Sequence, residues 1–578
     1  MLKRNAVLAT LLISGLAGGS CSRSGAPNAP KTNAGALIDV SKVPSFVSND
    51  EQGQGLWDAT RQVYTLRQFR PAWLAKGPLG SNVDATLRVL EDASSEGLHS
   101  DDFAVGDLQR LRNQLNTQAN PEVQGEFDTR LTYALVRYVS QLCLGRIDPR
   151  AVHPDWPAFE SNCDLSRIAN DAVEDNAVEN LARQLSPKLP EYDGLKTGLK
   201  RYRNLAEQGG WQPLSSQTGN ARTAQLDSEL ARVLELMGDL SPESGGAAPS
   251  RKVLTEALRH FQQRHGLEPD GRLGKKTVEA LSVPVLQRIE QIEINMDRMR
   301  WIAQRLEARH IRVNIPGFQL SVHDGEQVPL QMRAIVGSLE NPTPILDGTL
   351  EYLVFSPYWN IPLSITTKEI LPEIQKNPAY LKRENIEVVR VSKEKVEVID
   401  PSKIKWDKES DLSGYHLRQK PGATNSLGLV KFIFPNPHNV YLHDTPTGNL
   451  FDQLTRTLSH GCVRVEHPRD LAQYLLQDLP EWTPELIEEA MNAEQEKKVS
   501  LKTRLPIHLL YWTAWTDGEG SLQFRDDVYG YDQRHRELTT STNALPAADA
   551  PGIDVNKVGA RIVADSSSFH RQRSLSEH

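Results

Sequence analysis

The sequence has no long run of lysine or arginine, and its 66 basic residues are outnumbered by 74 acidic ones. A nucleic-acid-binding protein would be expected to carry a basic footprint, so this class of function is excluded. The chain also lacks an apolar stretch of about 20 residues, the length that a transmembrane helix needs. With 578 residues, of which 39% are hydrophobic, the sequence instead predicts several buried cores in a multi-domain protein.

The N-terminus has the pattern of a secretory signal peptide. Lys3 and Arg4 precede a short apolar run over residues 6–16, and small residues follow directly. We therefore expect residues 1–21 to direct export, with the periplasm as the destination. Residues 22–45 are rich in Ser, Gly, Ala, Pro and Asn, and this composition predicts a flexible linker.

Cys21 comes directly after the small residues at the end of the signal, so it is a candidate for lipidation. A lipid on this cysteine would anchor the exported protein to a membrane. The best signals of this kind carry Leu three residues before the cysteine, where this chain has Gly18. Cleavage by an ordinary signal peptidase near Gly19 or Ser20 is therefore the alternative.

Cysteine is scarce, with four residues in the whole chain. Thiols in an oxidising compartment tend to be paired or put to use. Cys143 and Cys163 lie twenty residues apart, and they either form a disulfide or leave Cys143 buried in a helix as a free thiol. Cys462 has no obvious partner, which indicates a functional thiol.

Hydrophobic periodicity changes along the chain and predicts a multi-domain α+β protein. Apolar residues recur at three- and four-residue spacing up to about residue 309, as in amphipathic helices, and then alternate as in strands. A Gly- and Ser-rich break near 241–250 divides the helical part. The predicted domains are a helical scaffold (46–240), a small helical module (250–283), a connecting helix (284–309), a mainly β domain (310–532) with an insertion at 364–420, and a disordered tail (533–578).

Two short segments of the β domain carry the residues suited to catalysis. Cys462 follows His460 by two residues, so both side chains face one side if this segment is extended. A thiol becomes a good nucleophile as a thiolate, which requires a base or a positive charge nearby. His443, from another strand, is the second candidate base. Gly461 permits close approach of substrate, and Arg464 is suited to binding a carboxylate or stabilising the thiolate.

The same segments, Tyr441–Pro446 and Ser459–Arg464, resemble the signature of L,D-transpeptidase catalytic domains. Residues 250–283 resemble a peptidoglycan-binding helical module, and the order of the parts is similar to that of the large murein L,D-transpeptidases. Further similarity to that family lies in Leu144–Pro149, Tyr358–Pro362, Gly422–Phe434, Thr513–Trp515 and Phe524–Asp527. Together the resemblance covers most of residues 45–532.

The resemblance implies that Cys462 is the nucleophile and His443 the general base that takes its proton. It further implies that the site is lined by Ser459, His460, Gly461 and Arg464, that Tyr441 and Trp359 lie near the donor peptide, and that 364–420 is a cap. The implied partners are peptidoglycan stem peptides: a donor tetrapeptide and the diaminopimelate amine of an acceptor, joined in a 3→3 cross-link. No metal or organic cofactor is implied, and carbapenems are expected to acylate the thiol.

Three alternatives remain open. An L,D-carboxypeptidase would use the same cysteine and histidine but transfer the acyl group to water. A metallopeptidase could draw on four histidines within thirty residues (His438, His443, His460 and His467), although no His-Glu-x-x-His helix is present. A non-catalytic peptidoglycan-binding scaffold would need only the helical module.

Overall fold

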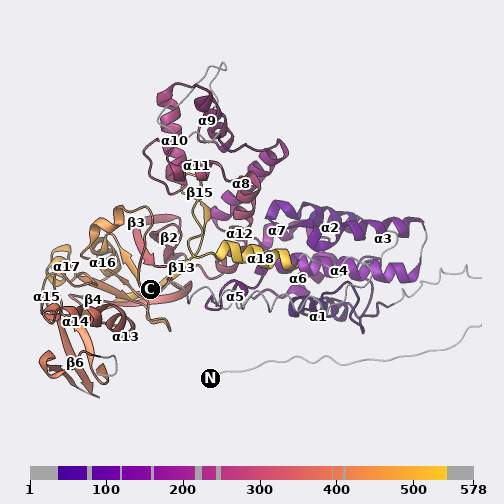
Figure 1. The fold of residues 1–578 in the computed structure, drawn as a ribbon. Coiled ribbons are helices and arrows are strands. Elements are labelled where there is room, and N and C mark those ends of the chain that lie inside the picture. Colours follow the sequence, from indigo (N-terminus) through magenta and orange to yellow (C-terminus); the bar gives the residue numbers. More distant parts are fainter. Residues whose placement is uncertain are drawn as a thin grey trace, which may run out of the picture.

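The computed structural model describes residues 37–74, 81–117, 120–157, 162–214, 224–241, 249–392, 395–407 and 412–542. The predicted signal, Cys21, most of the linker and most of the tail lie outside these ranges. A helical region, a protruding helical arm and a β domain are arranged around a central helix (Figure 1). This arrangement confirms the predicted multi-domain α+β fold. None of the helices within the described ranges is both long and apolar enough to cross a membrane.

The helical region is built around one long helix, α4. Asn120 caps its start, with Pro121 at the first helical position, and the helix ends at Gly145. Gly145 adopts a φ of 80°, and a Cβ here would lie 2.4 Å from the indole nitrogen of Trp301. The helices of this region are α1 (Glu51–Leu66), α2 (Ser81–Glu91), α3 (Val105–Thr117), α4 (Pro121–Leu144), α5 (Pro149–Val152), α6 (Leu165–Glu174) and α7 (Leu181–Leu185).

Two details of this region go beyond the sequence predictions. Cys143 and Cys163 form a disulfide that joins the end of α4 to the segment before α6, which decides between the two alternatives. The predicted flexible linker is corrected over 37–45, because Ile38 and Val40 are buried and the Ile38 N–H donates to the Phe69 carbonyl oxygen at 2.8 Å. The apolar residues of this short stretch pack on the helical region despite the polar sequence before them.

The arm consists of helices α8 (Pro190–Glu207), α9 (Ala224–Met237), α10 (Arg251–Arg264) and α11 (Lys275–Leu281). The turn between α10 and α11 is organised by the Gln262 amide, which donates to Asp270, Thr277 and the Arg272 carbonyl oxygen and accepts from the Gly271 N–H. Apolar side chains of α8 to α12 form one hydrophobic core. The predicted scaffold boundary at residue 240 therefore divides a single packed unit.

The central helix α12 (Val285–Ala303) ties the arm to the β domain. The side-chain amide of Asn295 donates to the Thr513 hydroxyl at 2.8 Å and accepts from the Thr513 N–H at 2.9 Å. Gln291 donates to the carbonyl oxygens of Thr513 and Arg525. These bonds hold the short hairpin of β14 (Ala514–Thr516) and β15 (Leu522–Phe524) against the helices of the arm.

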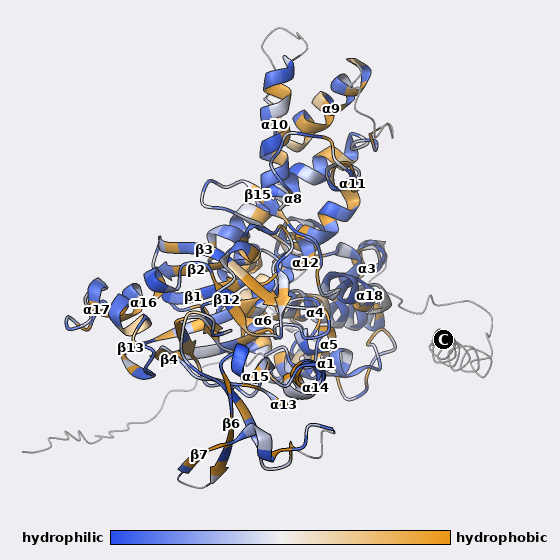
Figure 2. Cartoon of the chain, turned by 60° about the vertical axis from the view of Figure 1, so that its left-hand side comes forward, coloured by the Kyte–Doolittle hydropathy of each residue, from blue (hydrophilic) through white to orange (hydrophobic). Residues whose placement is uncertain are grey.

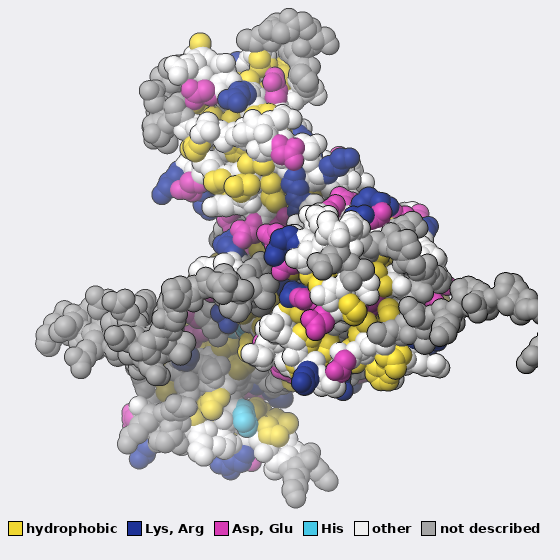
Figure 3. All heavy atoms as spheres, turned by 90° about the vertical axis from the view of Figure 1, so that its right-hand side faces the viewer, with side chains coloured by type: hydrophobic (Ala, Val, Ile, Leu, Met, Phe, Trp, Pro, Cys, Tyr) yellow, Lys and Arg dark blue, Asp and Glu magenta, His cyan; other side chains and the backbone are white. Residues whose placement is uncertain are grey.

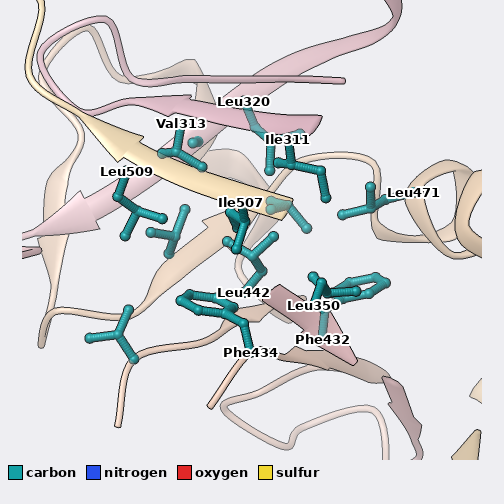
Figure 4. Packing of buried hydrophobic residues seen from close by; sticks show 14 of the residues in the cluster. Ile311, Val313, Leu320, Leu350, Phe432, Phe434, Leu442, Leu471, Ile507 and Leu509 are labelled. Carbon is teal, nitrogen blue, oxygen red and sulfur yellow. The ribbon is translucent and has the colours of Figure 1, made fainter. Parts of the chain in front are cut away.

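A nine-stranded mixed sheet forms the β domain, in the order β11-β3-β12-β10-β9-β4-β13-β1-β2. Strand β2 also pairs with β3, so the sheet curls back on itself around apolar side chains, several of which Figure 4 shows in close packing. The strands are β1 (Arg309–Asn314), β2 (Gln319–Asp324), β3 (Gln327–Gly337), β4 (Leu346–Phe355), β9 (Val430–Ile433), β10 (Leu442–His443), β11 (Thr457–Ser459), β12 (Val463–Val465) and β13 (Lys497–Leu510), and helices α16 (Pro468–Leu476) and α17 (Pro484–Met491) precede β13.

The predicted insertion is a separate cap that projects from the sheet (Figure 2). A four-stranded sheet and short helices enclose its own small hydrophobic core. A π-helical turn, Thr366–Ile370, lies at its base. Its elements are β5 (Trp359–Asn360), β6 (Ile386–Ser392), β7 (Lys395–Ile399), β8 (His416–Gln419), α13 (Leu363–Ile365), α14 (Leu371–Lys376) and α15 (Tyr380–Arg383).

The predicted disordered tail begins later than residue 533, because α18 (Tyr531–Thr542) is a helix. The Asp532 carboxylate accepts hydrogen bonds from buried Arg298 at 2.5 Å and from the Thr513 hydroxyl at 2.6 Å. This segment has few large apolar residues, and its composition therefore predicted disorder. The polar contacts that hold it in place are made with distant residues and cannot be read from composition. On the face in Figure 3, basic and acidic side chains are interspersed over the helical region and the arm.

Candidate active site

The register of the sheet brings four predicted site residues to one face. Strands β10 and β12 pair in parallel, with Leu442 opposite Val463 and His443 opposite Arg464. Leu442 and Val463 are fully buried in the core. Because side chains alternate along a strand, the flanking residues, Tyr441, His443, Cys462 and Arg464, project from the opposite face.

Cys462 lies directly before β12 and is the one free cysteine in the part of the chain that the structure describes. Its Sγ lies 3.9 Å from the Asn439 carbonyl oxygen. Burial raises the pKa of the thiol, while hydrogen bonding to Tyr441 and the charge of Arg464 act in the opposite direction. The Val463 N–H donates to the Tyr441 carbonyl oxygen at 3.1 Å and fixes this turn against β10. A thiol with a raised pKa needs a base in order to react at neutral pH.

His443 is 4% exposed and has the properties of such a base. Its Nδ1 lies 2.5 Å from the Asp444 carbonyl oxygen. A carbonyl oxygen only accepts, so Nδ1 carries the proton and Nε2 keeps a free lone pair. Burial and the charge of Arg464, with a further contribution from Lys431, lower the pKa of His443 to about 3. The imidazole is therefore neutral at physiological pH and lies diagonally across the register from Cys462.

The turn before Cys462 is held by Ser459 and Thr343. The Ser459 hydroxyl donates to the Cys462 carbonyl oxygen at 2.5 Å and accepts from the Gly461 N–H at 3.2 Å. The Thr343 hydroxyl donates to the Gly461 carbonyl oxygen at 2.8 Å. Gly461 has a φ of 108°, a conformation that favours glycine.

These bonds bear on which backbone N–H groups could hold an oxyanion. The Gly461 N–H is already committed to Ser459. Within the described residues, the Cys462 N–H has no hydrogen-bond partner. We therefore assign the free donor of this turn to Cys462, and Ser459 and Thr343 are positioning residues that hold the backbone in place.

His460 and Trp359 both contact the cap. The Nε2 of His460 lies 2.6 Å from the Glu369 carboxylate in the π-helical turn of the cap. Trp359 packs against the hydrophobic core of the cap. His460 therefore connects the turn before Cys462 to the cap.

Sequence reasoning missed Lys431, whose position follows only from the order of the strands. Strand β9 pairs with β10 in antiparallel fashion, and Lys431 is directly opposite His443. Lys431, His443 and Arg464 therefore form one row across three neighbouring strands. The available signal was a basic residue inside the β-rich run of residues 430–434, and it did not indicate which residues would be its neighbours.

The four histidines considered as metal ligands do not converge. His460 pairs with Glu369, and His467 lies 3.7 Å from Glu466. Across the described ranges, no three His, Cys, Asp or Glu side chains are grouped so that they could hold a metal ion.

Comparisons with known proteins agree with this architecture. Family models match residues 58–199 ("Scaffold domain"), 240–281 ("Putative peptidoglycan binding domain") and 308–494 ("L,D-transpeptidase catalytic domain"). The third match contains the strands that carry Cys462 and His443.

Two curated proteins are similar to parts of the chain. A "Putative L,D-transpeptidase" of Haemophilus influenzae is 30% identical over 273 residues, which are 46% of this chain and 54% of the relative. The chain thus spans about half the length of this relative. An "Epoxide hydrolase 1" of Sus scrofa is 29% identical over 87 residues, 15% of this chain and 19% of that protein. The three family models and the longer match thus show that the chain contains a region similar to L,D-transpeptidase catalytic domains, preceded by regions similar to a scaffold domain and a peptidoglycan-binding domain.

Proposed function

We propose that this protein is a peptidoglycan L,D-transpeptidase that forms 3→3 cross-links through an acyl-enzyme on Cys462. The observation that carries the proposal is the pairing of β10 with β12, which puts a free thiol and a neutral, buried imidazole on one face of the sheet. A thiol and a base so arranged are suited to acyl transfer.

In the first half-reaction, His443 Nε2 takes the proton of the Cys462 thiol as sulfur attacks the carbonyl carbon of the third stem residue. The carbonyl oxygen becomes an oxyanion, and the free Cys462 N–H is placed to donate to it. The peptide C–N bond then breaks, and the His443 imidazolium returns the proton to the departing amine of D-alanine. A thioester on Cys462 remains.

In the second half-reaction, the side-chain amine of a diaminopimelate on another stem attacks the thioester. His443 accepts a proton from this amine and passes it to the departing sulfur, so the free thiol is restored. One peptide bond is broken and one is formed, and no external energy source is required. Water in place of the amine would give L,D-carboxypeptidase activity instead.

The cap favours transfer to an amine. The contact between His460 and Glu369 brings the base of the cap next to the catalytic turn. A cover at this position restricts the access of water to the thioester. The separate cap is the feature that supports cross-linking over hydrolysis.

Incubating purified protein with disaccharide-tetrapeptides tests the proposal. We expect dimers with a 3→3 link in mass spectrometry, together with released D-alanine, and no product from Cys462→Ala. Lys502→Met, at an exposed site near Asp478, is the matched control and should behave as wild type. Tripeptides without dimers would establish carboxypeptidase activity. Wild-type muropeptides in cells that carry only Cys462→Ala would indicate a non-catalytic scaffold.

We also propose that the protein acts in the periplasm, exported by residues 1–21, with a lipid on Cys21 as the anchor. The residue pattern of the N-terminus supports this proposal. Metabolic labelling with a clickable fatty acid should mark the wild type but not Cys21→Ala. A carbapenem should add its mass to wild type but not to Cys462→Ala, because its strained acyl group reacts with the same thiol.

A further inference from the structure

The active-site face carries two cations that lack a carboxylate partner. Lys431 and Arg464 lie on either side of His443, on β9 and β12. Among the described residues, neither forms a salt bridge, and the Arg464 Nε is buried without a hydrogen-bond partner. Burial lowers the pKa of both side chains, so both are partly removed from water.

Several basic side chains nearby and in the core are paired, whereas Arg288, Arg456 and Arg525 donate to neutral amide or carbonyl oxygens. Arg333 binds Glu466, and Arg418 on β8 of the cap binds Glu387. Buried Arg298 binds Asp532. A desolvated cation without a counter-ion is unfavourable. Lys431 and Arg464 differ from the three arginines with neutral partners in flanking His443 on the face that carries Cys462, where a bound ligand would supply the opposite charge.

Lys431 is held in place without being neutralised. Its ammonium donates to the Tyr358 carbonyl oxygen at 3.2 Å, a neutral partner that uses one of three N–H groups. Glu496 attracts Lys431 but lies beyond ion-pair distance, and its carboxylate accepts from the Tyr358 N–H at 3.0 Å. The ammonium thus keeps its charge and two donors for another partner.

The substrate of the proposed reaction carries suitable anions. A donor tetrapeptide ends in the carboxylate of its fourth residue, and the third residue, diaminopimelate, carries a carboxylate on its side chain. Two residues along a strand span about 7 Å, and neighbouring strands lie about 5 Å apart. A peptide whose scissile carbonyl lies at Cys462 therefore has both carboxylates within reach of this row.

We propose that Lys431, together with Arg464, binds a carboxylate of the donor stem peptide and makes the enzyme selective for donors in which that carboxylate is free. This inference rests on the proposed function and adds a specificity-determining residue to it. Lys431 contacts the substrate anion, while Cys462 and His443 perform the acyl transfer.

The test compares three donor tetrapeptides: one with both carboxylates free, one with a C-terminal amide, and one with an amidated diaminopimelate side chain. For wild type we expect kcat/KM to fall about tenfold with one of the two amides, which identifies the carboxylate that is bound. Lys431→Met should lose about tenfold on the free donor, mainly through KM, and should be nearly unchanged on that amide.

Two further variants separate binding from folding. Lys431→Arg keeps the charge and should keep the discrimination between free and amidated donors. Lys502→Met removes an exposed charge and should match wild type on all three donors. The melting temperature and the carbapenem adduct on Cys462 report whether each variant is folded and has a reactive thiol.

Equal losses of Lys431→Met on the free and both amidated donors would assign Lys431 a structural role and overturn the inference. Wild-type kinetics of Lys431→Met on all donors would overturn it as well. In both cases the wild type still acts on stem peptides, so the proposed function stands. If wild type acts on none of the donors, the proposed function itself fails.

Discussion

His443 and Arg464 are register partners on parallel strands, so an imidazole and a guanidinium lie side by side on one face of the sheet. The guanidinium opposes protonation of the imidazole and favours the thiolate form of Cys462. One cation therefore keeps the imidazole neutral and makes the thiol easier to ionise, as the proposed roles of base and nucleophile require.

Replacing Arg464 with Met should raise the pKa of the Cys462 thiol further, because a nearby opposite charge is removed. The rate of alkylation of Cys462 by iodoacetamide, followed by peptide mass across pH, would show a midpoint shifted to higher pH. Arg469→Met, which removes an exposed arginine on α16, is the control. A midpoint that stays in place or moves to lower pH would contradict the role assigned to Arg464.

Removing the contact between the cap and the catalytic turn should change the fate of the thioester. Glu369 and His460 are both about half exposed, so their contact is worth at most about 1 kcal/mol. Glu369→Gln should therefore raise the ratio of hydrolysis to cross-linking up to about fivefold. His460→Asn and the double variant complete a double-mutant cycle. If the effects of the two single substitutions on this ratio are strictly additive in the double variant, the two residues do not act through each other.

Asp532 should be essential for the stability of the helical region. Asp532→Ala leaves Arg298, whose side chain is 1% exposed, without its carboxylate, at a cost of about 3–5 kcal/mol. Urea unfolding should show this loss, while Arg534→Ala, exposed on the same helix, should stay within about 0.5 kcal/mol of wild type. A similarly small effect of Asp532→Ala would mean that α18 contributes little to the fold.

The stability of the β domain should depend on pH through two stacked histidines. The rings of His310 and His323 lie 4.8 Å apart, and burial and Arg312 lower their pKa values to about 4 and about 3. Their unfolded pKa is about 6.5, so between pH 6.5 and 4 the unfolded chain binds protons that the folded chain does not. The free energy of unfolding should therefore fall as the pH is lowered through this range.

His323→Gln isolates this effect, because it removes one of the two titrating rings. The slope of the unfolding free energy against pH is proportional to the number of protons that the chain takes up on unfolding. In His323→Gln this number should be smaller by up to one proton, so the slope should decrease accordingly. Denaturant titrations at pH 7, 6, 5 and 4 would measure it. Identical slopes for wild type and His323→Gln would exclude the pair as the cause of acid sensitivity.

The sequence predicted those features that depend on residues close together along the chain. Cys462 and Arg464 lie two residues apart, so an extended backbone alone puts them on one face, and the change of period near residue 310 marks the start of the β domain. The position of Lys431 beside His443 depends on β9 pairing with β10, and no local pattern specifies which strands become neighbours.

Polar contacts between residues far apart in the sequence account for most of the other differences between the predicted and the observed structure. The first residues of the predicted tail fold because Asp532 meets Arg298 from a distant helix, and composition alone does not reveal such a partner. Similarly, the direction of His460 is set by Glu369, which belongs to an insertion ninety-one residues earlier. Long-range polar contacts of this kind become visible only in three dimensions.

The bonds of Asn295 and Gln291 to the segment after β13 have a mechanical consequence. A load applied to the arm passes into the catalytic sheet through α12, a helix of 19 residues that is about 28 Å long. The strands that carry Cys462 and His443 lie away from this load path, on the far side of β9 and β4 from β13. The thiol and the imidazole are therefore separated from the strand that receives this load by two strands in one direction and by three in the other.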